Sequence, residues 1–174
     1  MATSDYRWRV TEYDLALFIL RVALGLTMAA HGANKFRSGL DGVAGWFDSM
    51  GMRPGAMHAR FAAGGEVLAG LFLAAGLLTS FAALGFVGLM VVAAVTVHLS
   101  KGFFILDEGW EYVFILGVTA GAIALLGPGR WSIDRAIGID DNLDGWLGLA
   151  ISAGGGLAAA GGLLSVFYRP PKGE

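Results

Sequence analysis

The chain has 174 residues, of which 56% are hydrophobic and only 15% charged, and its mean hydropathy is +0.65. This composition is typical of a membrane protein rather than of a soluble domain. A net charge of −2 leaves no basic surplus for binding phosphates, which argues against nucleic-acid binding, and the absence of cysteine excludes disulfides, thiolate metal sites and CxxC redox pairs within the chain.

Five apolar stretches are predicted to cross the membrane, which takes roughly 17–25 helical residues. In chain order they cover residues 13–30, 59–78, 81–99, 111–126 and 147–168. The break at Thr79 and Ser80 is so short that the second and third helices must be antiparallel neighbours. We therefore predict an all-α fold, a polytopic membrane four-helix bundle within residues 1–134. Residues 135–174 are predicted to form a linker, a fifth C-terminal transmembrane helix and a short polar tail.

Two connections between these stretches carry apolar patterns of their own. Between His31 and His58, four apolar residues follow an i, i+3, i+4, i+7 spacing: Val43, Trp46, Phe47 and Met50. This spacing predicts a short amphipathic helix over residues 41–50, lying in the interface as a lid over the helices. In the connection 100–110, the apolar residues 102–104 (GFF) either dip into the membrane or serve as an aromatic anchor.

Several charged side chains fall within or beside the predicted spans, where each costs about 2.5–3.5 kcal/mol to insert and is a candidate for function. The topology places the end of the first helix, the start of the second, the end of the third and the start of the fourth on one side of the membrane. The polar residues gathered on that side are His31, Lys35, Glu66, His98 and Glu111.

Arg21 and Glu66 both approach the membrane midplane from that side and are predicted to lie within hydrogen-bonding reach. One interpretation is a buried ion pair that specifies helix register. The other is a proton carrier, in which Arg21 biases the ionisation of the Glu66 carboxyl. On the second interpretation the catalytic residues are Arg21, Glu66 and His98.

A quinone is the cofactor that this cluster suggests, because imidazoles beside an apolar pocket can hydrogen-bond a quinone carbonyl and deliver protons. The predicted quinone-binding residues are His31, Lys35 and Glu111. Alternatives are interfacial histidines, a snorkelling Lys35, and a Glu111 that stabilises a helix N-terminus. A haem or metal held by His31 and His98 is not expected, because no CxxCH motif is present. His58 is assigned to the surface.

The pattern of these residues resembles the DoxX family of small integral membrane proteins, which is related to the DoxD-type small subunit of thiosulfate:quinone oxidoreductase. The matching segments, from residue 15 to 134, are 20–25 (LRVALG), 31–36 (HGANKF), Glu66 with Gly70 and 76–79 (GLLT), His98 with 102–104, Glu111, and 127–134 (GPGRWSID). The resemblance implies a four-helix unit in the cell membrane, associated with respiratory or sulfur redox chemistry.

Two functions follow as hypotheses. In the first, the protein is a quinone-linked oxidoreductase subunit in which the Arg/Glu/His cluster transfers protons, and electrons arrive from a small reductant or a partner protein. In the second, it is a non-catalytic membrane anchor or scaffold that recruits redox or stress-response enzymes. Transport of a small solute is a third class, but the chain lacks the inverted repeat of many transporters. The glycine-rich face of the fifth helix suggests docking to a membrane subunit or self-association into a homo-oligomer.

Overall fold

The computed structural model describes the backbone of residues 2–171 and the side chains of residues 11–140 and 142–171. Within that range the chain is helical, apart from loops and an isolated antiparallel bridge between Met52 and Tyr168. The longer helices are α1 (Ala2–Ser38), α2 (Leu40–Ser49), α3 (Gly55–Ala75), α4 (Thr79–Ala93), α5 (Glu111–Leu126) and α9 (Gly156–Phe167), with the shorter α6 (Ile133–Ile137), α7 (Asp140–Leu143) and α8 (Gly145–Leu149) between α5 and α9. The all-α prediction is confirmed.

Helix α1 packs antiparallel along α3 because small residues let the two backbones approach closely. A Cβ added at Gly25 would lie 2.4 Å from the carbonyl oxygen of Gly70, and one at Gly32 would lie 2.6 Å from that of Ala63. These contacts set the register between α1 and α3. The register determines which polar residues of the two helices can meet.

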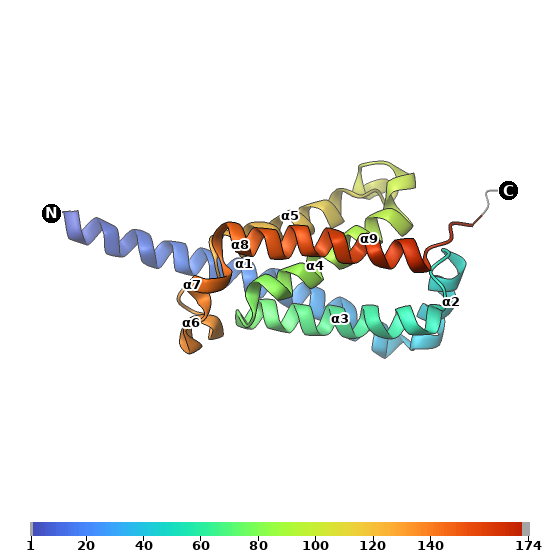
Figure 1. The fold of residues 1–174 in the computed structure, drawn as a ribbon, viewed down its shortest axis with the longest axis horizontal. Coiled ribbons are helices and arrows are strands. Elements are labelled where there is room, and N and C mark those ends of the chain that lie inside the picture. The colour runs from blue at the N-terminus through green and yellow to red at the C-terminus, as the bar shows by residue number, and fades with distance from the viewer. Residues whose placement is uncertain (1, 172–174) are drawn as a thin grey trace.

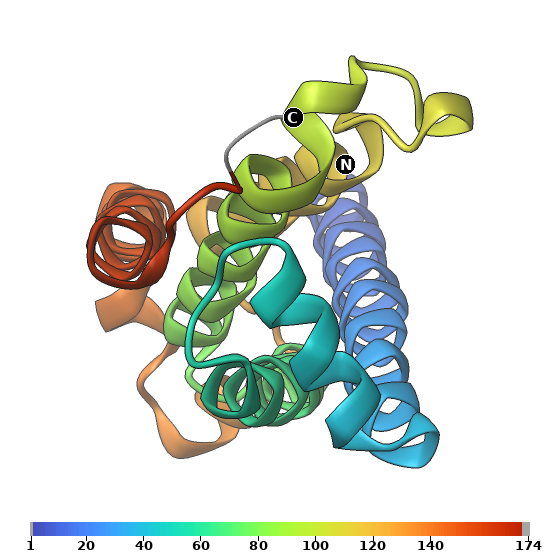
Figure 2. The ribbon, with the colours of Figure 1, turned by 90° about the vertical axis from the view of Figure 1, so that its right-hand side faces the viewer.

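Helix α4 lies at the centre and packs against α3, α5 and α9. Viewed along the long axis, α4 lies between α9 and the other helices, and α2 crosses the near end (Figure 2). The core around α4 contains Leu73 and Phe86, which are 0% and 1% exposed, and residues of α5 such as Ile123. At its end α4 continues into a π-helical turn, Ala94–His98, that carries His98.

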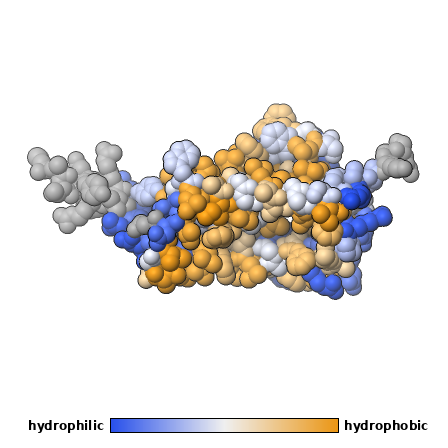
Figure 3. All heavy atoms as spheres, viewed as in Figure 1, coloured by the Kyte–Doolittle hydropathy of each residue, from blue (hydrophilic) through white to orange (hydrophobic). Residues whose placement is uncertain are grey.

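Three helical segments are long and apolar enough to cross a membrane, namely Thr11–Ser38, Thr79–Lys101 and Gly145–Phe167, while Glu111–Leu126 is apolar but shorter. The face drawn in Figure 3 is hydrophobic through its middle and hydrophilic at its two ends. The protein is therefore a multi-pass membrane protein. Three of the five predicted spans meet these criteria. Of the other two, Glu111–Leu126 is too short, and α3 carries His58, Arg60 and Glu66 within its apolar sequence.

Several predicted boundaries shift in the structure. The first helix ends at Ser38 rather than at residue 30, because Lys35 and Arg37 continue its last turns instead of starting a loop. The predicted amphipathic segment 41–50 is confirmed as α2, whose Phe47 is buried, and the start of the helix at Glu111 is confirmed. The predicted linker contains α6 and α7. Figure 1 places these two short helices at the opposite end of the molecule from α2.

The C-terminal helix is joined to the rest of the chain at both of its ends. The C-terminal segment Gly145–Phe167 consists of α8, a π-helical turn (Ala150–Gly155) and α9. Just before this segment, Ser80 Oγ donates to the carbonyl oxygen of Leu143 (2.5 Å), and just after it the backbone N–H of Arg169 donates to the carbonyl oxygen of Gly51 (2.9 Å). The Met52–Tyr168 bridge lies beside the second contact. Helix α9 is therefore fixed across α4 and against the α2–α3 loop.

Candidate functional site

Arg21 occupies the end of the molecule that holds α6 and α7, and it is 0% exposed. Its Nη1 donates to the carbonyl oxygens of Leu73 (3.4 Å) and Ala74 (3.1 Å), and its Nη2 donates to that of Trp131 (2.7 Å). The last carbonyls of a helix have no partners within the helix. Arg21 therefore satisfies the C-terminal end of α3 and fastens the loop after α5 to it.

Asp134 closes the turn between α3 and α4. Its carboxylate accepts hydrogen bonds from the backbone N–H groups of Leu78 (2.7 Å) and Thr79 (2.9 Å) and from Thr79 Oγ1 (2.7 Å). Leu78 has a φ of 46°, a left-handed conformation that is costly for a residue with a side chain. The carboxylate thus holds a strained turn in place and satisfies the first N–H groups of α4.

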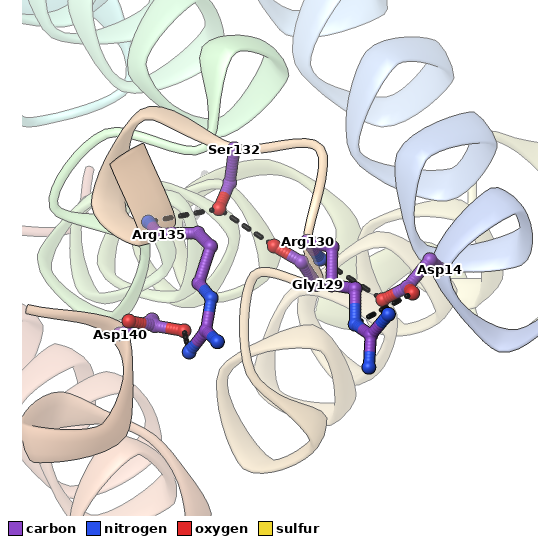
Figure 4. A network of polar contacts seen from close by, with 6 residues as sticks. All are labelled: Asp14, Gly129, Arg130, Ser132, Arg135 and Asp140. Atoms are coloured by element: carbon purple, nitrogen blue, oxygen red, sulfur yellow. Dashed lines mark hydrogen bonds and ion pairs between the residues drawn. The ribbon is translucent and has the colours of Figure 1, made fainter. Parts of the chain in front are cut away.

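A second set of polar contacts ties the loop after α5 to α1 at the same end (Figure 4). Asp14 Oδ1 accepts from the backbone N–H of Arg130 (2.9 Å), and Asp14 Oδ2 lies 3.6 Å from Arg130 Nε. Ser132 Oγ donates to the carbonyl oxygen of Gly129 (2.7 Å), and Arg135 Nη1 donates to Asp140 (2.9 Å). Together with Arg21 and Asp134, these residues form what we call the anchored junction.

The predicted pair between Arg21 and Glu66 is wrong. Arg21 lies opposite Leu73 and Ala74 on α3, whereas Glu66 is eight residues before Ala74, or about 12 Å along the helix at 1.5 Å per residue. The prediction placed Arg21 in the membrane by its distance from a helix end near His31. In the structure α1 continues to Ser38, so Lys35 is still part of the helix, and Lys35 rather than Arg21 is the residue of α1 that meets Glu66.

Lys35 and Glu66 form an ion pair at the opposite end of the molecule. Lys35 Nζ donates to Glu66 Oε1 (2.6 Å) and also contacts Oε2, and the two side chains are 23% and 11% exposed. Side chains on a helix lean toward its N-terminus, so the long Lys35 side chain extends back along α1 and its ammonium group meets the carboxylate of Glu66. The snorkelling alternative for Lys35 is wrong in this structure, because its ammonium group is bound by a partly buried carboxylate.

His98 is held by the loop that follows α4. Its Nδ1 lies 2.6 Å from the carbonyl oxygen of Glu108. Glu108 has a left-handed φ of 61°, and its side chain pairs with Lys101. The hydrogen bond and the charge of Lys101 lower the pKa of Glu108 below the ordinary value of a glutamate. The loop thus fixes the ring of His98 through its backbone, at the end of a π-helical turn of the kind often found at functional sites.

A cavity of about 570 Å³ brings together four of the predicted site residues, His31, Lys35, Glu66 and His98. Its apolar lining residues include Met28 of α1, Phe47 of α2, Met50 just after α2, Phe86 of α4 and Leu163 of α9. His31 is an exposed residue at its border. The site is therefore an apolar chamber with an ion pair and an imidazole in its wall; we call it the polar-walled cavity.

Glu111 does not line this cavity. Its Oε2 accepts a hydrogen bond from the backbone N–H of Ile105 (3.0 Å), so that the carboxylate joins the first turn of α5 to the preceding loop. Glu111, predicted to bind a quinone, therefore stabilises the loop that holds His98. Arg21, predicted to be catalytic, belongs to the anchored junction and also lies outside the cavity lining.

His58 was assigned to the surface, and that assignment is wrong. The residue is 4% exposed and lines the polar-walled cavity, with ring centroids 6.1 Å from Phe47 and 5.1 Å from Phe167. Its Nε2 has no hydrogen-bond partner among the described residues. The sequence does carry a signal, since His58, Ala62 and Glu66 recur every four residues on one face of α3.

Comparison with known protein families matches residues 16–99 to DoxX. The matched range contains Arg21, Lys35, Glu66 and His98, and it ends before α5 and the C-terminal helices. No curated protein and no solved structure matches the chain.

Proposed function

Residues 16–99 form a DoxX family domain, and from this premise we propose that the polar-walled cavity binds the headgroup of a quinone and exchanges protons with it. We also propose that α1, α3, α4 and α5 form the four-helix membrane unit of the family, in the cell membrane, with α9 as an added fifth helix. The packing of α1 on α3, and of α4 on both α3 and α5, supports this arrangement.

The observation that carries the functional proposal is the composition of the cavity wall. A quinone ring needs an apolar chamber with a few hydrogen-bonding groups that fix its carbonyl oxygens. The cavity offers apolar walls together with His98 and the Lys35–Glu66 pair. Its volume of about 570 Å³ falls in the range typical of small-molecule sites.

The hydrogen bond of His98 specifies what its ring can do. A carbonyl oxygen only accepts, so Nδ1 carries the proton in the contact with Glu108, and Nε2 of the neutral ring is an acceptor. A neutral His98 can therefore accept a proton from a quinol hydroxyl group. The protonated ring can donate a hydrogen bond to a quinone carbonyl. In both cases Glu108 keeps the ring oriented.

Lys35, in place of Arg21, is the cation that pairs with Glu66. The pair puts a hydrogen-bond donor and an acceptor side by side in the cavity wall, where they can bond to a quinone carbonyl or a quinol hydroxyl group. Glu66 lies about 12 Å along α3 from His58, so the cavity extends over about two turns of this helix. His31, exposed at its border, is suited to exchange protons with the outside.

The overall chemistry is the uptake of two protons and two electrons by a quinone to form a quinol. The cysteine-free chain has no thiol of its own to supply electrons. We propose that they come from a small reductant or from a partner redox protein, membrane-bound or soluble. The chain's own residues then bind the ring and move the protons.

Titration of the purified protein with a quinone tests this function. We expect saturable binding to the wild type, and binding about tenfold weaker or lost in Glu66→Gln and His98→Ala. The matched control is Arg60→Gln, an exposed residue on the same helix as Glu66, which should bind as the wild type does. All variants are first shown to be folded by circular dichroism. A folded wild type that binds no quinone would contradict the proposal.

A non-catalytic anchor or scaffold is the second candidate. The anchored junction favours it, because the buried Arg21 bonds only to backbone carbonyls and so contributes to structure rather than chemistry. On this hypothesis the exposed faces of the helices dock a partner or a second copy of the chain. Co-purification of a stoichiometric partner together with the absence of quinone binding would support it.

A further inference from the structure

The loop between α4 and α5, residues 102–110, carries three large apolar side chains that are exposed. Leu106 is 93% exposed, Phe104 65% and Ile105 48%. In Figures 1 and 2 this loop projects sideways from the helices, instead of continuing along them beyond the end of the bundle. Along the long axis it lies at a level that α9 also occupies, whereas α2 lies farther toward that end (Figure 1). We call residues 104–106 the wedge.

Helix α5, which follows the loop, is too short to cross a membrane by itself. Its 16 residues, Glu111–Leu126, measure about 24 Å, whereas the hydrocarbon core is about 30 Å thick. The helix ends at the anchored junction, where the side chains of Arg130 and Arg135 are 64% and 50% exposed and mark the aqueous side. The start of α5 therefore lies below the opposite membrane surface. The loop before it then lies at the boundary between acyl chains and headgroups.

The backbone of the loop makes its hydrogen bonds within the loop. The N–H groups of residues 107–111 each donate to a carbonyl oxygen of residues 102–105, over 2.9–3.1 Å. The N–H group of Ile105 donates to Glu111 Oε2 (3.0 Å). A backbone group that leaves water without a partner costs free energy, so this internal pairing lowers the cost of placing the loop against lipid.

Aromatic rings and an ion pair form the base of the loop. Phe103 packs edge to face on Trp110, with ring centroids 4.8 Å apart, and Trp110 packs on Phe114 of α5 at 5.5 Å. Tryptophan is enriched at the level of the lipid headgroups. Lys101 and Glu108 pair with each other, so their charges are balanced within the loop. The base therefore suits the headgroup region, with the wedge extending from it.

We infer that the wedge inserts among the acyl chains just below the lipid headgroups, so that the bilayer is the partner of this surface. Lipid is favoured over a protein partner by the sideways projection of the loop at the level of α9 and by the shortness of α5. The wedge is also continuous, through Trp110, with exposed apolar residues of α5, namely Phe114, Ile115 and Val118. An apolar surface at the membrane boundary typically enters by about 5–10 Å.

The inference also bears on the polar-walled cavity. Glu108, whose carbonyl oxygen holds His98, follows the wedge directly, and its own N–H group donates to the carbonyl oxygen of Ile105 (2.9 Å). The surface that contacts lipid and the residue that orients His98 are therefore joined within one short loop.

The absence of cysteine allows a single nitroxide spin label to be placed at a chosen position. The test variant is Leu106→Cys, whose side chain contributes little packing because it is 93% exposed. The lipid-facing control is Ile115→Cys on α5, and the water-facing control is Ser38→Cys, an exposed residue at the end of α1. Each labelled protein is shown to be folded by circular dichroism and placed in phosphatidylcholine vesicles. Electron paramagnetic resonance then measures collisions of the label with oxygen, which concentrates among acyl chains, and with a neutral nickel complex, which stays in water.

We expect the label at position 106 to collide with oxygen and to lose most of the nickel collisions that the label at position 38 shows, as the label at position 115 does. Nickel collisions as frequent at position 106 as at position 38 would place the wedge in water and overturn the inference. Protection from both reagents would overturn it as well, because protein would then cover the wedge. If that protection disappeared on dilution with excess lipid, the covering protein would be a second copy of the chain. No quinone enters the measurement, so its result is independent of the proposed function.

Discussion

The two ends of the molecule use buried polar groups in opposite ways. At the anchored junction, Arg21 and Asp134 bond to backbone groups of segments far apart in the sequence, so that each polar group closes a joint between elements. At the polar-walled cavity, the side chains of Lys35 and Glu66 pair with each other and His98 is held by one ring nitrogen, beside open space. Buried charge that bonds to backbone groups holds elements of the fold together, whereas charge beside a cavity is accessible to a ligand.

The largest expected effect on stability comes from removing the Arg21 hydrogen bonds of the anchored junction. In Arg21→Met the carbonyl oxygens of Leu73, Ala74 and Trp131 lose a charged donor, and we expect a loss of stability on the order of 3 kcal/mol. Thermal unfolding in detergent, followed by circular dichroism, measures the change. If Arg21→Met had unchanged stability but no longer bound quinone, Arg21 would be a binding residue rather than a structural residue of the anchored junction.

The register between the two ends depends on the contact of α1 with α3. In Gly25→Ala the new Cβ would lie 2.4 Å from the carbonyl oxygen of Gly70, so we expect a loss of about 1–3 kcal/mol. The matched control is Gly64→Ala on α3, where a Cβ meets nothing within 4 Å and helix propensity should raise stability by up to about 1 kcal/mol. Both changes are measured by the same unfolding experiment. Equal stability of the two variants would contradict the close approach.

At the polar-walled cavity, we expect substitutions to change quinone affinity with little change in the free energy of unfolding. Lys35→Met should lower quinone affinity about tenfold while the free energy of unfolding changes by about 1 kcal/mol or less, because the pair is partly solvated. The control is Arg60→Met, which removes an exposed cation of α3 that does not line the cavity and should leave affinity unchanged. If Lys35→Met lost as much stability as Arg21→Met, the Lys35–Glu66 pair would be a structural contact like those of the anchored junction.

The smallest effect concerns pH at the loop that holds His98. Because Lys101 lowers the pKa of Glu108, the pair stabilises the loop at pH values above the ordinary glutamate pKa, and this contribution is lost as the pH falls through the lowered pKa. An NMR titration of the Glu108 carboxyl should give a pKa that rises toward the ordinary value in Lys101→Met. An identical pKa in both proteins would show that the pair does not form in solution.

The positions of the helices could be predicted from the sequence, whereas the partners of the charged residues could not. Apolar runs and the spacing of residues 43–50 indicate helices directly, since each pattern is local. The register between α1 and α3 depends on where α1 ends, and Lys35 and Arg37 have the composition of a loop although they lie in the last turn of the helix. Backbone carbonyls, which bind Arg21, have no sequence signature at all.

Two buried polar residues, Asp134 and His58, were not assigned their roles from the sequence. Asp134 was noted as part of a motif, but its role depends on the left-handed Leu78, which only the structure reveals. His58 was overlooked because it precedes the predicted start of its helix, although α3 begins at Gly55. For His58, an error of a few residues at a helix boundary changed the assignment of a buried polar side chain.

The attachment of the C-terminal helix has a consequence for biogenesis. Helix α9 leaves the ribosome after the DoxX domain, yet its residues Ala160 and Leu163 complete the wall of the polar-walled cavity, and the Met52–Tyr168 bridge closes only when residue 168 has been made. Without α9 the wall of the cavity is incomplete on one side. The last helix to be synthesised therefore turns an open side into a chamber.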